Sequence, residues 1–368
     1  MAGSAHPSMN RFSGKLALQQ RVLPHYRAPF FDLLASACDR GMSLFTGLPR
    51  PIEGITTTDQ LHVADYKLGK NIHLFNKSFY LCYQRGLIEW LEKQNPDVLI
   101  MEANPRYLST PSAVKWMHQR GKPVIGWGLG AGTGGMIWKS FINQFDAMIS
   151  YSQRGADEYA ELGFPKDKIF VAYNSVSPVP TQPQPSRPST FNNQPTILFV
   201  GRLQARKRLD YLLRACADIQ NIRLVIVGDG PERESLGTLA KEIYPNAKFV
   251  GAKHGDELKA YFEEADLFVL PGTGGLAVQE AMSYGLPIIV AQGDGTQDDL
   301  VRKENGWQIL PDDYNALVST MKDALSDVAR LRKMENESYR IVREEINIEK
   351  MVDVFTSVAS TLNSLTAK

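Results

Sequence analysis

The chain has 368 residues, of which 43% are hydrophobic and 22% are charged, and its formal net charge is +1. This length indicates two domains of ordinary globular composition, and the near-zero net charge with many apolar residues excludes a mainly disordered chain. A membrane-spanning protein is not expected, because apolar runs such as 197–200 and 267–270 fall far short of ~20 residues.

The first eleven residues contain one basic residue and no apolar core, so they predict no secretory signal peptide. Residues 1–10 are left out of the fold prediction, because their small side chains are typical of a flexible end. The three cysteines, Cys38, Cys82 and Cys216, lie far apart and form no CxxC pair. They predict neither a disulfide framework nor a zinc site, and a reducing cytoplasm is the expected compartment.

Short apolar runs alternate with helical patterns along most of the chain. Strand-like runs occur first at 98–101, 124–127, 147–151 and 169–172. Helical patterns between them include 30–37, 87–91 and 155–162. The segment 177–195 has six prolines among polar residues and predicts an extended linker. After it, strand-like runs recur at 196–200, 224–227, 248–250, 267–270 and 287–291.

Apolar runs separated by amphipathic helices are typical of parallel, doubly wound sheets. We therefore expect an α/β chain of two Rossmann-like domains that face each other across a cleft. The first domain, 1–178, would bind the acceptor, and 179–195 would be the proline-rich linker. The second domain is expected over 196–347, and residues 348–368 are expected to form a helix that can cross back to the first domain.

The two halves of the chain differ in charge. Residues 1–180 carry 19 basic and 14 acidic side chains, a charge of +5, and residues 181–368 carry −4. A basic first half fits an anionic acceptor or peripheral contact with the inner face of a membrane, and an ordinary solvated surface explains it equally well. No polybasic run indicates nucleic acid.

Two loops that follow strands in the second half begin with a glycine. Gly201-Arg202-Leu203 comes directly after the strand 196–200, and Lys207 follows just before a helix. Two cations beside a helix start can stabilise a diphosphate leaving group, although surface charges near a loop would look the same. The turn at 228–231, Gly-Asp-Gly-Pro, follows the strand 224–227 and by itself is a common strand-to-helix junction.

A third loop, which is rich in glycine, follows the strand 267–270. It contains Gly272, Thr273, Gly274, Gly275 and Leu276, and a helix follows that includes Glu280. Exposed backbone N–H groups at such a helix start can hold a phosphate or a sugar. The carboxylate of Glu280 can accept hydrogen bonds from ribose hydroxyls, and a solvent-facing helical Glu is the alternative.

These three loops belong to an ordered series that also includes Ala-Asp-Leu-Phe-Val-Leu-Pro at 265–271, a helix from Gln-Glu-Ala-Met to Tyr-Gly-Leu-Pro at 279–287, and Asn305-Gly306. The series resembles the second domain of the family 4 retaining glycosyltransferases of the GT-B fold. The first half resembles the family less closely. Its residues 23–31 look like the first strand-to-helix loop of members that build bacterial cell-surface polysaccharides and glycoconjugates.

The resemblance implies a nucleoside-diphosphate-sugar donor, with UDP or GDP, held mainly by the second domain. Arg202 and Lys207 match the diphosphate-binding pair and would be the catalytic cations. Glu280 matches the second Glu of the Glu-x7-Glu motif, which holds the ribose. The first Glu of that motif is replaced by Gly272. The remaining donor-binding candidates are Gly201, Thr273, Gly274, Gly275 and Leu276, with Gly251, Lys253 and His254 in the nucleobase loop.

The resemblance implies transfer with retention to a hydroxyl of a glycan, lipid-linked or small-molecule acceptor, without a protein nucleophile. No cofactor and no metal are expected, because no Asp-x-Asp pair is present. Two alternatives stay open. The chain could be a non-catalytic subunit that binds a sugar nucleotide, or a GT-B sugar-nucleotide epimerase.

Several residues of the first half are candidate donor or acceptor contacts. They are Arg27, Glu102, Trp127, Gly128 and Gly130. Gly130, Gly132 and Gly135 also fit G-x-G-x-x-G, but this motif lies in mid-domain and the next strand ends in Ser152 rather than an acidic residue. A dinucleotide cofactor is therefore not expected. The segment 130–135 is interpreted either as a loop in the cleft or as a plain surface turn.

Overall fold

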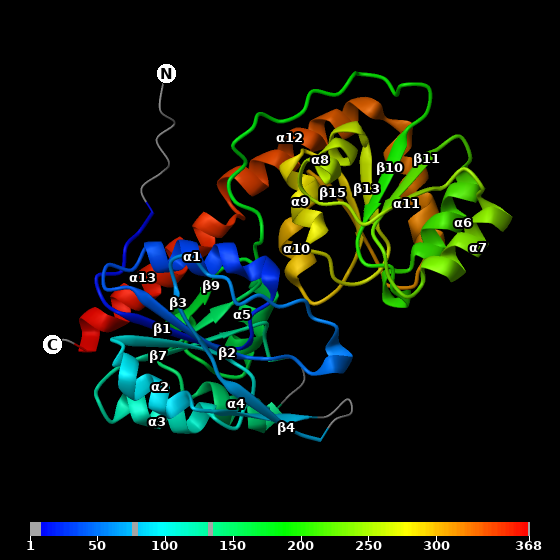
Figure 1. Cartoon of the computed structure of the whole chain (residues 1–368). Helices are drawn as coiled ribbons and strands as arrows, with labels where there is room; N and C mark the ends of the chain where they lie inside the picture. The colour runs from blue at the N-terminus through cyan, green and yellow to red at the C-terminus, as the bar shows by residue number, and fades with distance from the viewer. Residues whose placement is uncertain (1–8, 76–79, 132–134, 367–368) are drawn as a thin grey trace. The chain divides into compact units, whose positions relative to one another are not determined.

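The computed structural model describes residues 9–75, 80–131 and 135–366. The chain forms two compact units, of which one comprises residues 1–176 and 348–368 and the other residues 177–347 (Figure 1). The C-terminal helix therefore belongs to the first unit, although the second unit precedes it in sequence.

The first unit is built on a seven-stranded parallel sheet with the order β3-β2-β1-β6-β7-β8-β9. The strands are β1 (Leu16–Val22), β2 (Met42–Gly47), β3 (Asp65–Leu68), β6 (Val98–Glu102), β7 (Val124–Gly128), β8 (Ala147–Ser150) and β9 (Ile169–Val171). A separate antiparallel hairpin pairs β4 (Lys70–Leu74) with β5 (Leu81–Arg85). Parallel strands need crossover connections, and helices supply most of them here.

Helices cover both faces of this sheet, because neighbouring side chains of a strand point to opposite faces. Leu16 and Leu18 pack with α1 (Ala28–Ser36) and α13 (Ile348–Thr366). Ala17 faces the other core, which includes side chains of α2 (Leu87–Gln94), α3 (Thr110–His118) and α4 (Gly135–Ile142). The remaining helix of this unit, α5 (Gln153–Glu161), contacts β8 and β9.

The second unit has a six-stranded parallel sheet with the order β12-β11-β10-β13-β14-β15. The strands are β10 (Thr196–Val200), β11 (Arg223–Val227), β12 (Lys248–Gly251), β13 (Leu267–Leu270), β14 (Ile288–Ala291) and β15 (Gly306–Ile309). The helices are α6 (Leu209–Ile219), α7 (Arg233–Ile243), α8 (Gly255–Glu264), α9 (Ala277–Ser283), α10 (Thr296–Leu300), α11 (Tyr314–Ser326) and α12 (Val328–Glu344). The strand order reverses between β10 and β13, and ligands of open α/β sheets bind at the carboxyl ends of strands at such a point.

The proline-rich segment 177–195 has no helix or strand and packs on the second unit. Arg187 fixes it there, because its guanidinium donates to the carbonyls of Phe262, Ala265 and Tyr284 at 2.8, 2.6 and 3.1 Å. The same side chain lies 3.7 Å from the carboxylate of Glu335 on α12.

Candidate active site

Three loops of the second unit meet at the carboxyl ends of β10, β11 and β13. The loop after β10 is bonded to the loop after β11, since the Leu203 N–H donates to the Asp229 carbonyl at 2.9 Å. It is bonded to the loop after β13 as well, where the Thr273 N–H donates to the Arg206 carbonyl at 3.1 Å. The three motifs that the sequence singles out therefore form one connected surface at the topological switch point.

Glycine is required where these loops touch. A Cβ atom at Gly228 would clash with the Gly201 carbonyl oxygen, and Gly228 has a φ of +138°. A Cβ atom at Gly272 would clash with the Arg206 carbonyl oxygen and lie 2.5 Å from the Cα atom of Lys207. The side chain of a Glu cannot fit at position 272 in this conformation. The departure from the Glu-x7-Glu motif thus has a structural counterpart in the tight packing of Gly272 against the Lys207 backbone.

Lys207 is the most constrained cation of this surface. Its side chain is buried, and its Nζ donates to the Thr273 carbonyl at 3.0 Å and to the Gly274 carbonyl. Burial, with the charge of Arg206 adding to it, lowers the pKa of Lys207 to about 8. The ammonium group is therefore held at the loop after β13, where burial disfavours its positive charge and a nearby anion would stabilise it.

Arg202 and Arg206 complete the positive charge of the β10 loop. Both side chains are exposed, and the Arg206 guanidinium donates to the Thr273 carbonyl at 3.4 Å. Sequence reasoning missed Arg206, although its place directly before Lys207 is a signal that could have found it.

Glu280 lies on α9, four residues after Leu276. Burial raises the pKa of its carboxyl group, and the nearby imidazole of His254 opposes this shift. His254 stands directly before α8, in the loop after β12. The predicted ribose and nucleobase contacts therefore lie close together. Of the other loop residues, Gly251 accepts a hydrogen bond from the Gly228 N–H at 2.8 Å, and Lys253 pairs with Glu257 at 3.2 Å.

Two first-unit candidates have structural roles. Arg27 is buried, and its guanidinium donates to the Ser175 carbonyl at 3.0 Å and to the Asn174 side chain. The guanidinium of Arg27 is thus bonded within the first unit, and its contact with a donor or acceptor stays a prediction. Glu102 ends β6 and accepts hydrogen bonds from the Arg21 N–H at 2.7 Å and the Tyr107 hydroxyl at 2.8 Å.

Trp127 lies in the core of the first unit, and its contact with a sugar stays a prediction. Its side chain is 0% exposed and packs against Phe30, Phe31 and Phe355, with ring centroids 5.0–6.4 Å apart. These side chains enclose the ring. The residue ends a strand, but the last side chains of a strand that is covered on both faces still point into a core.

Gly128, which ends β7, and Gly130, which follows the strand, are both closely packed. A Cβ atom at Gly128 would lie 2.6 Å from the Tyr159 hydroxyl, and one at Gly130 would clash with the Glu158 carboxylate. The Gly130 N–H donates to the Tyr159 hydroxyl at 3.2 Å. This packing accounts for glycine at both positions without a ligand. Gly132 lies outside the described residues.

Two features are absent from the described residues. Residues 9–75, 80–131 and 135–366 contain no group of three or more His, Cys, Asp or Glu side chains placed to hold a metal ion. In the same ranges, every helix is too short or too polar to cross a membrane.

Residues 182–341 match the family model of the glycosyl transferases group 1. This segment is similar to the group 1 glycosyl transferases and makes up less than half of the chain. Across 214 residues the chain is 30% identical to an uncharacterized glycosyltransferase, MJ1607, of Methanocaldococcus jannaschii, covering 51% of this chain and 55% of that protein. It is 33% identical over 150 residues to a GDP-mannose-dependent alpha-mannosyltransferase of Corynebacterium glutamicum, covering 40% of this chain and 35% of that one. The matches thus span about half or less of these relatives.

The likeness of the chain to solved structures extends over both units. Anabaena HepE, whose structure was solved in complex with UDP, has a TM-score of 0.71 at 14% identity, with 95% of this chain and all of that chain covered. At this identity the likeness establishes the fold alone. Together with the two parallel sheets, it shows that the chain has the GT-B fold.

Proposed function

We propose that the chain is a retaining glycosyltransferase that moves a sugar from a UDP- or GDP-sugar to a hydroxyl group of a glycan, lipid-linked or small-molecule acceptor. The observation that carries the proposal is the buried ammonium group of Lys207, bonded to the Thr273 and Gly274 carbonyls at the switch point of the second sheet. An anion next to this group would offset the cost of its burial.

The proposed site binds a diphosphate through charge. Lys207 keeps its proton at neutral pH, because its pKa of about 8 still lies above 7. Arg202 adds a permanent charge from the same loop, and the first N–H groups of α9 have no carbonyl partner within the helix. Charge develops on the diphosphate as the bond to the sugar breaks, so cations fixed there stabilise the transition state more than the bound donor.

The proposed chemistry is a front-face displacement. The bond between the sugar and the diphosphate breaks first, and an oxocarbenium-like sugar forms. The acceptor hydroxyl attacks from the same face and gives its proton to the departing diphosphate, so that the configuration is retained. This route uses no protein nucleophile and no metal.

Glu280 is the proposed partner of the ribose hydroxyls, and the loop with Gly251, Lys253 and His254 is the proposed nucleobase contact. The UDP complex of HepE and the GDP-mannose dependence of the Corynebacterium relative support a nucleoside diphosphate as the ligand class. They leave uridine and guanosine as the two bases to test.

We propose the cytoplasm as the compartment, with peripheral membrane contact through the basic first half. Cys38, Cys82 and Cys216 are all buried free thiols, which supports a reducing environment.

Gly272 supports a second candidate, a non-catalytic subunit that binds a sugar nucleotide. A donor sugar held without the Glu of the family motif could be bound but not transferred. A sugar-nucleotide epimerase remains the third candidate, and conversion of the donor without any acceptor would identify it.

The test incubates the full chain with a panel of UDP- and GDP-sugars, with and without glycan acceptors, and measures nucleoside diphosphate release and glycosylated product. The proposal expects release that depends on an acceptor, with an α-linked product from an α-linked donor. Nucleotide binding without release would favour the non-catalytic subunit. Product of inverted configuration would contradict the retaining mechanism.

A further inference from the structure

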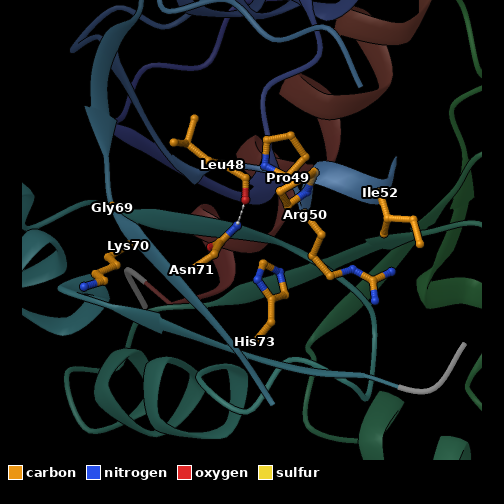
Figure 2. Close-up of a pocket in the computed structure, with 9 residues that line it drawn as sticks. Leu48, Pro49, Arg50, Ile52, Gly69, Lys70, Asn71 and His73 are labelled. Atoms are coloured by element: carbon orange, nitrogen blue, oxygen red, sulfur yellow. Dashed lines mark hydrogen bonds between the residues drawn. The ribbon is translucent and has the colours of Figure 1, made fainter. Parts of the chain in front are cut away.

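A separate cavity of about 570 Å³ lies within the first unit, at the carboxyl edge of its sheet (Figure 2). Its lining comes from the segment after β2 and from the start of the β4–β5 hairpin, and consists of Leu48, Pro49, Arg50, Pro51, Ile52, Gly69, Lys70, Asn71 and His73. Ligands of open parallel sheets gather at this edge, and the volume lies in the range of small-molecule sites.

Positive charge is concentrated beside this cavity. The guanidinium of Arg50 stacks on the ring of Tyr80, with its Cζ atom 3.9 Å from the ring centroid. The Cζ atoms of Arg21 and Arg106 lie 5.6 and 5.5 Å from the same centroid. Three guanidinium groups from three parts of the chain thus surround one aromatic ring.

Two carboxylates offset only part of this charge. Glu53 accepts hydrogen bonds from Arg21 at 2.8 Å and from Arg50 at 3.1 Å, which hold the pKa of Glu53 below its ordinary value although burial acts to raise it. Glu102 accepts from the backbone N–H of Arg21. Three guanidinium groups against two carboxylates leave a surplus of one positive charge.

His73 provides an independent sign of a missing partner. Its Nε2 atom is buried and has no hydrogen-bond partner among the described residues. In Figure 2 its imidazole lies beside the side chain of Arg50. Burial and the charges of Arg21 and Arg50 lower the pKa of His73, and Glu53 opposes them. Burial first, and then the nearby positive charges, therefore favour the neutral imidazole, and the ring of Tyr80 lies beside it with the ring centroids 5.9 Å apart.

The floor and the rim of the cavity differ in character. Asn71 is held by hydrogen bonds to the Arg21 and Leu48 carbonyls at 2.8 and 2.9 Å, so the floor is ordered before any ligand binds. The rim is apolar and open, with Ile52 81% exposed and Leu48 57% exposed. An apolar rim beside the guanidinium of Arg50 suits a ligand that has both an uncharged ring and an anionic group.

We propose that this cavity binds the anionic group of the acceptor, so that the enzyme glycosylates a saccharide that carries a phosphate or a carboxylate. The anion lies against Arg50 and His73, and the uncharged part of the saccharide rests on Leu48 and Ile52. The acceptor role rests on the proposed glycosyltransferase function, whereas binding of the anion itself does not.

The direct test follows the histidine C–H resonances of the full chain by NMR, with the His73 signal assigned from its loss in His73→Gln. The probes are inorganic phosphate, methyl glucuronide and the neutral methyl glucoside. The proposal expects at least one anionic probe to move the signal in a saturable way and to raise the pKa of His73 by about one, because a nearby negative charge favours the imidazolium. A response to phosphate alone or to glucuronide alone identifies the anion.

Variants locate the response. Arg106→Ala changes an exposed side chain and should weaken the binding of the anion about 5-fold, as expected for loss of one charge near the surface. Arg40→Ala is the matched control, because Arg40 is an exposed arginine that precedes β2 at the opposite edge of the same sheet. Lys207→Ala should leave the His73 response unchanged, which excludes phosphate bound at the proposed donor site as its cause.

Two results would overturn the inference. His73 could fail to respond to both anions, or respond equally to the neutral glucoside. Binding of nucleoside diphosphates is measured separately. If they bind while His73 does not respond, the inference about the cavity fails and the proposed function does not. If His73 responds but phosphate- and carboxylate-bearing acceptors are glycosylated no faster than neutral ones, the acceptor assignment is wrong.

Discussion

At the scale of single residues, Lys207 has the least ordinary environment of the proposed donor site. Its ammonium group is buried and bonded to two carbonyl oxygens, and its pKa is lowered to about 8. Burial of a charged group without a counter-ion is unfavourable, and proteins accept it mainly at functional sites.

Removal of this charge should slow the proposed transfer. Lys207→Ala is expected to lower kcat/KM by about 10²-fold, since one charge-assisted contact to the leaving group is lost. Lys241→Ala, at an exposed position on α7, is the matched control and should leave the rate unchanged. Steady-state kinetics with the best donor measure both. Equal rates for the two variants would exclude an electrostatic role of Lys207.

The lowered pKa of Lys207 also predicts how binding depends on pH. Lys207 is protonated below about pH 8 and loses its charge as the pH rises through that value. The affinity for a nucleoside diphosphate should therefore begin to fall between pH 7 and 8, since half of the Lys207 side chains are neutral at the pKa, and should fall further above pH 8. Lys207→Arg should bind without this decline, because arginine keeps its proton. Affinities measured by titration at a series of pH values check the prediction, and an identical decline in the arginine variant would contradict it.

Glu280 is predicted to select for the ribose. Glu280→Gln should reduce the preference for UDP over 2′-deoxy-UDP, or for GDP over its deoxy form, from about 10-fold to near one, because the charged acceptor of the 2′-hydroxyl is lost. Glu242→Gln, exposed on α7, is the control. A preference that survives in Glu280→Gln would assign ribose recognition to another group.

The burial of two first-unit candidates has a common physical cause. Arg27 and Trp127 follow or end strands, where sequence reasoning expects ligands. Arg27 is instead occupied by Asn174 and Ser175, which lie almost 150 positions along the chain, and Trp127 is enclosed by side chains that include Phe355 of the last helix. Contacts between such distant segments leave no local signal. The glycine-rich motifs could be predicted because their spacing relative to the strands is local.

At the scale of elements, the apolar runs of the second half predict five of its six strands. They miss β15, where Trp307 and Gln308 are only half-buried and the apolar signal is weak. In the first half they predict β6 to β9 and miss β1 to β5, and the sequence of β1 includes Gln19, Gln20 and Arg21. These polar side chains are buried because they bond to specific partners, such as Glu53 for Arg21. The sequence of the strand therefore lacks the apolar run by which the other strands are predicted.

The linker provides a prediction at this scale. Arg187 joins the segment 177–195 to the second unit by three hydrogen bonds to carbonyls, and its charge faces the buried carboxylate of Glu335. Arg187→Met should lower the free energy of unfolding by about 2–3 kcal/mol, since it removes one of the two guanidinium partners of the buried Glu335 carboxylate and the hydrogen bonds to three carbonyl groups. Denaturant unfolding measures the loss.

The double variant Arg187→Met/Glu335→Met sharpens that test. Removal of both charges should restore part of the lost stability, although Arg332 also pairs with Glu335 at 2.6 Å. A double variant that is less stable than Arg187→Met would show that the carbonyl hydrogen bonds, rather than the charge pair, hold the linker.

At the scale of the whole molecule, the alternation of strands and helices predicts two parallel, doubly wound sheets, and the GT-B fold is confirmed. The C-terminal helix is part of the first unit, where α13 packs against α1. Its amphipathic pattern indicates a helix but cannot say which sheet it covers. The strand order of the second sheet is what turns three separate loops into one proposed site.

Isothermal titration of the full chain with UDP and with GDP tests the central claim most directly, namely that the second unit holds a pyrophosphate beside Lys207. One of the two nucleotides should bind with a micromolar dissociation constant, and Lys207→Ala should weaken that binding about 10²-fold while Lys241→Ala leaves it unchanged. Absence of binding by both nucleotides, or undiminished binding by the Lys207→Ala variant, would contradict the account.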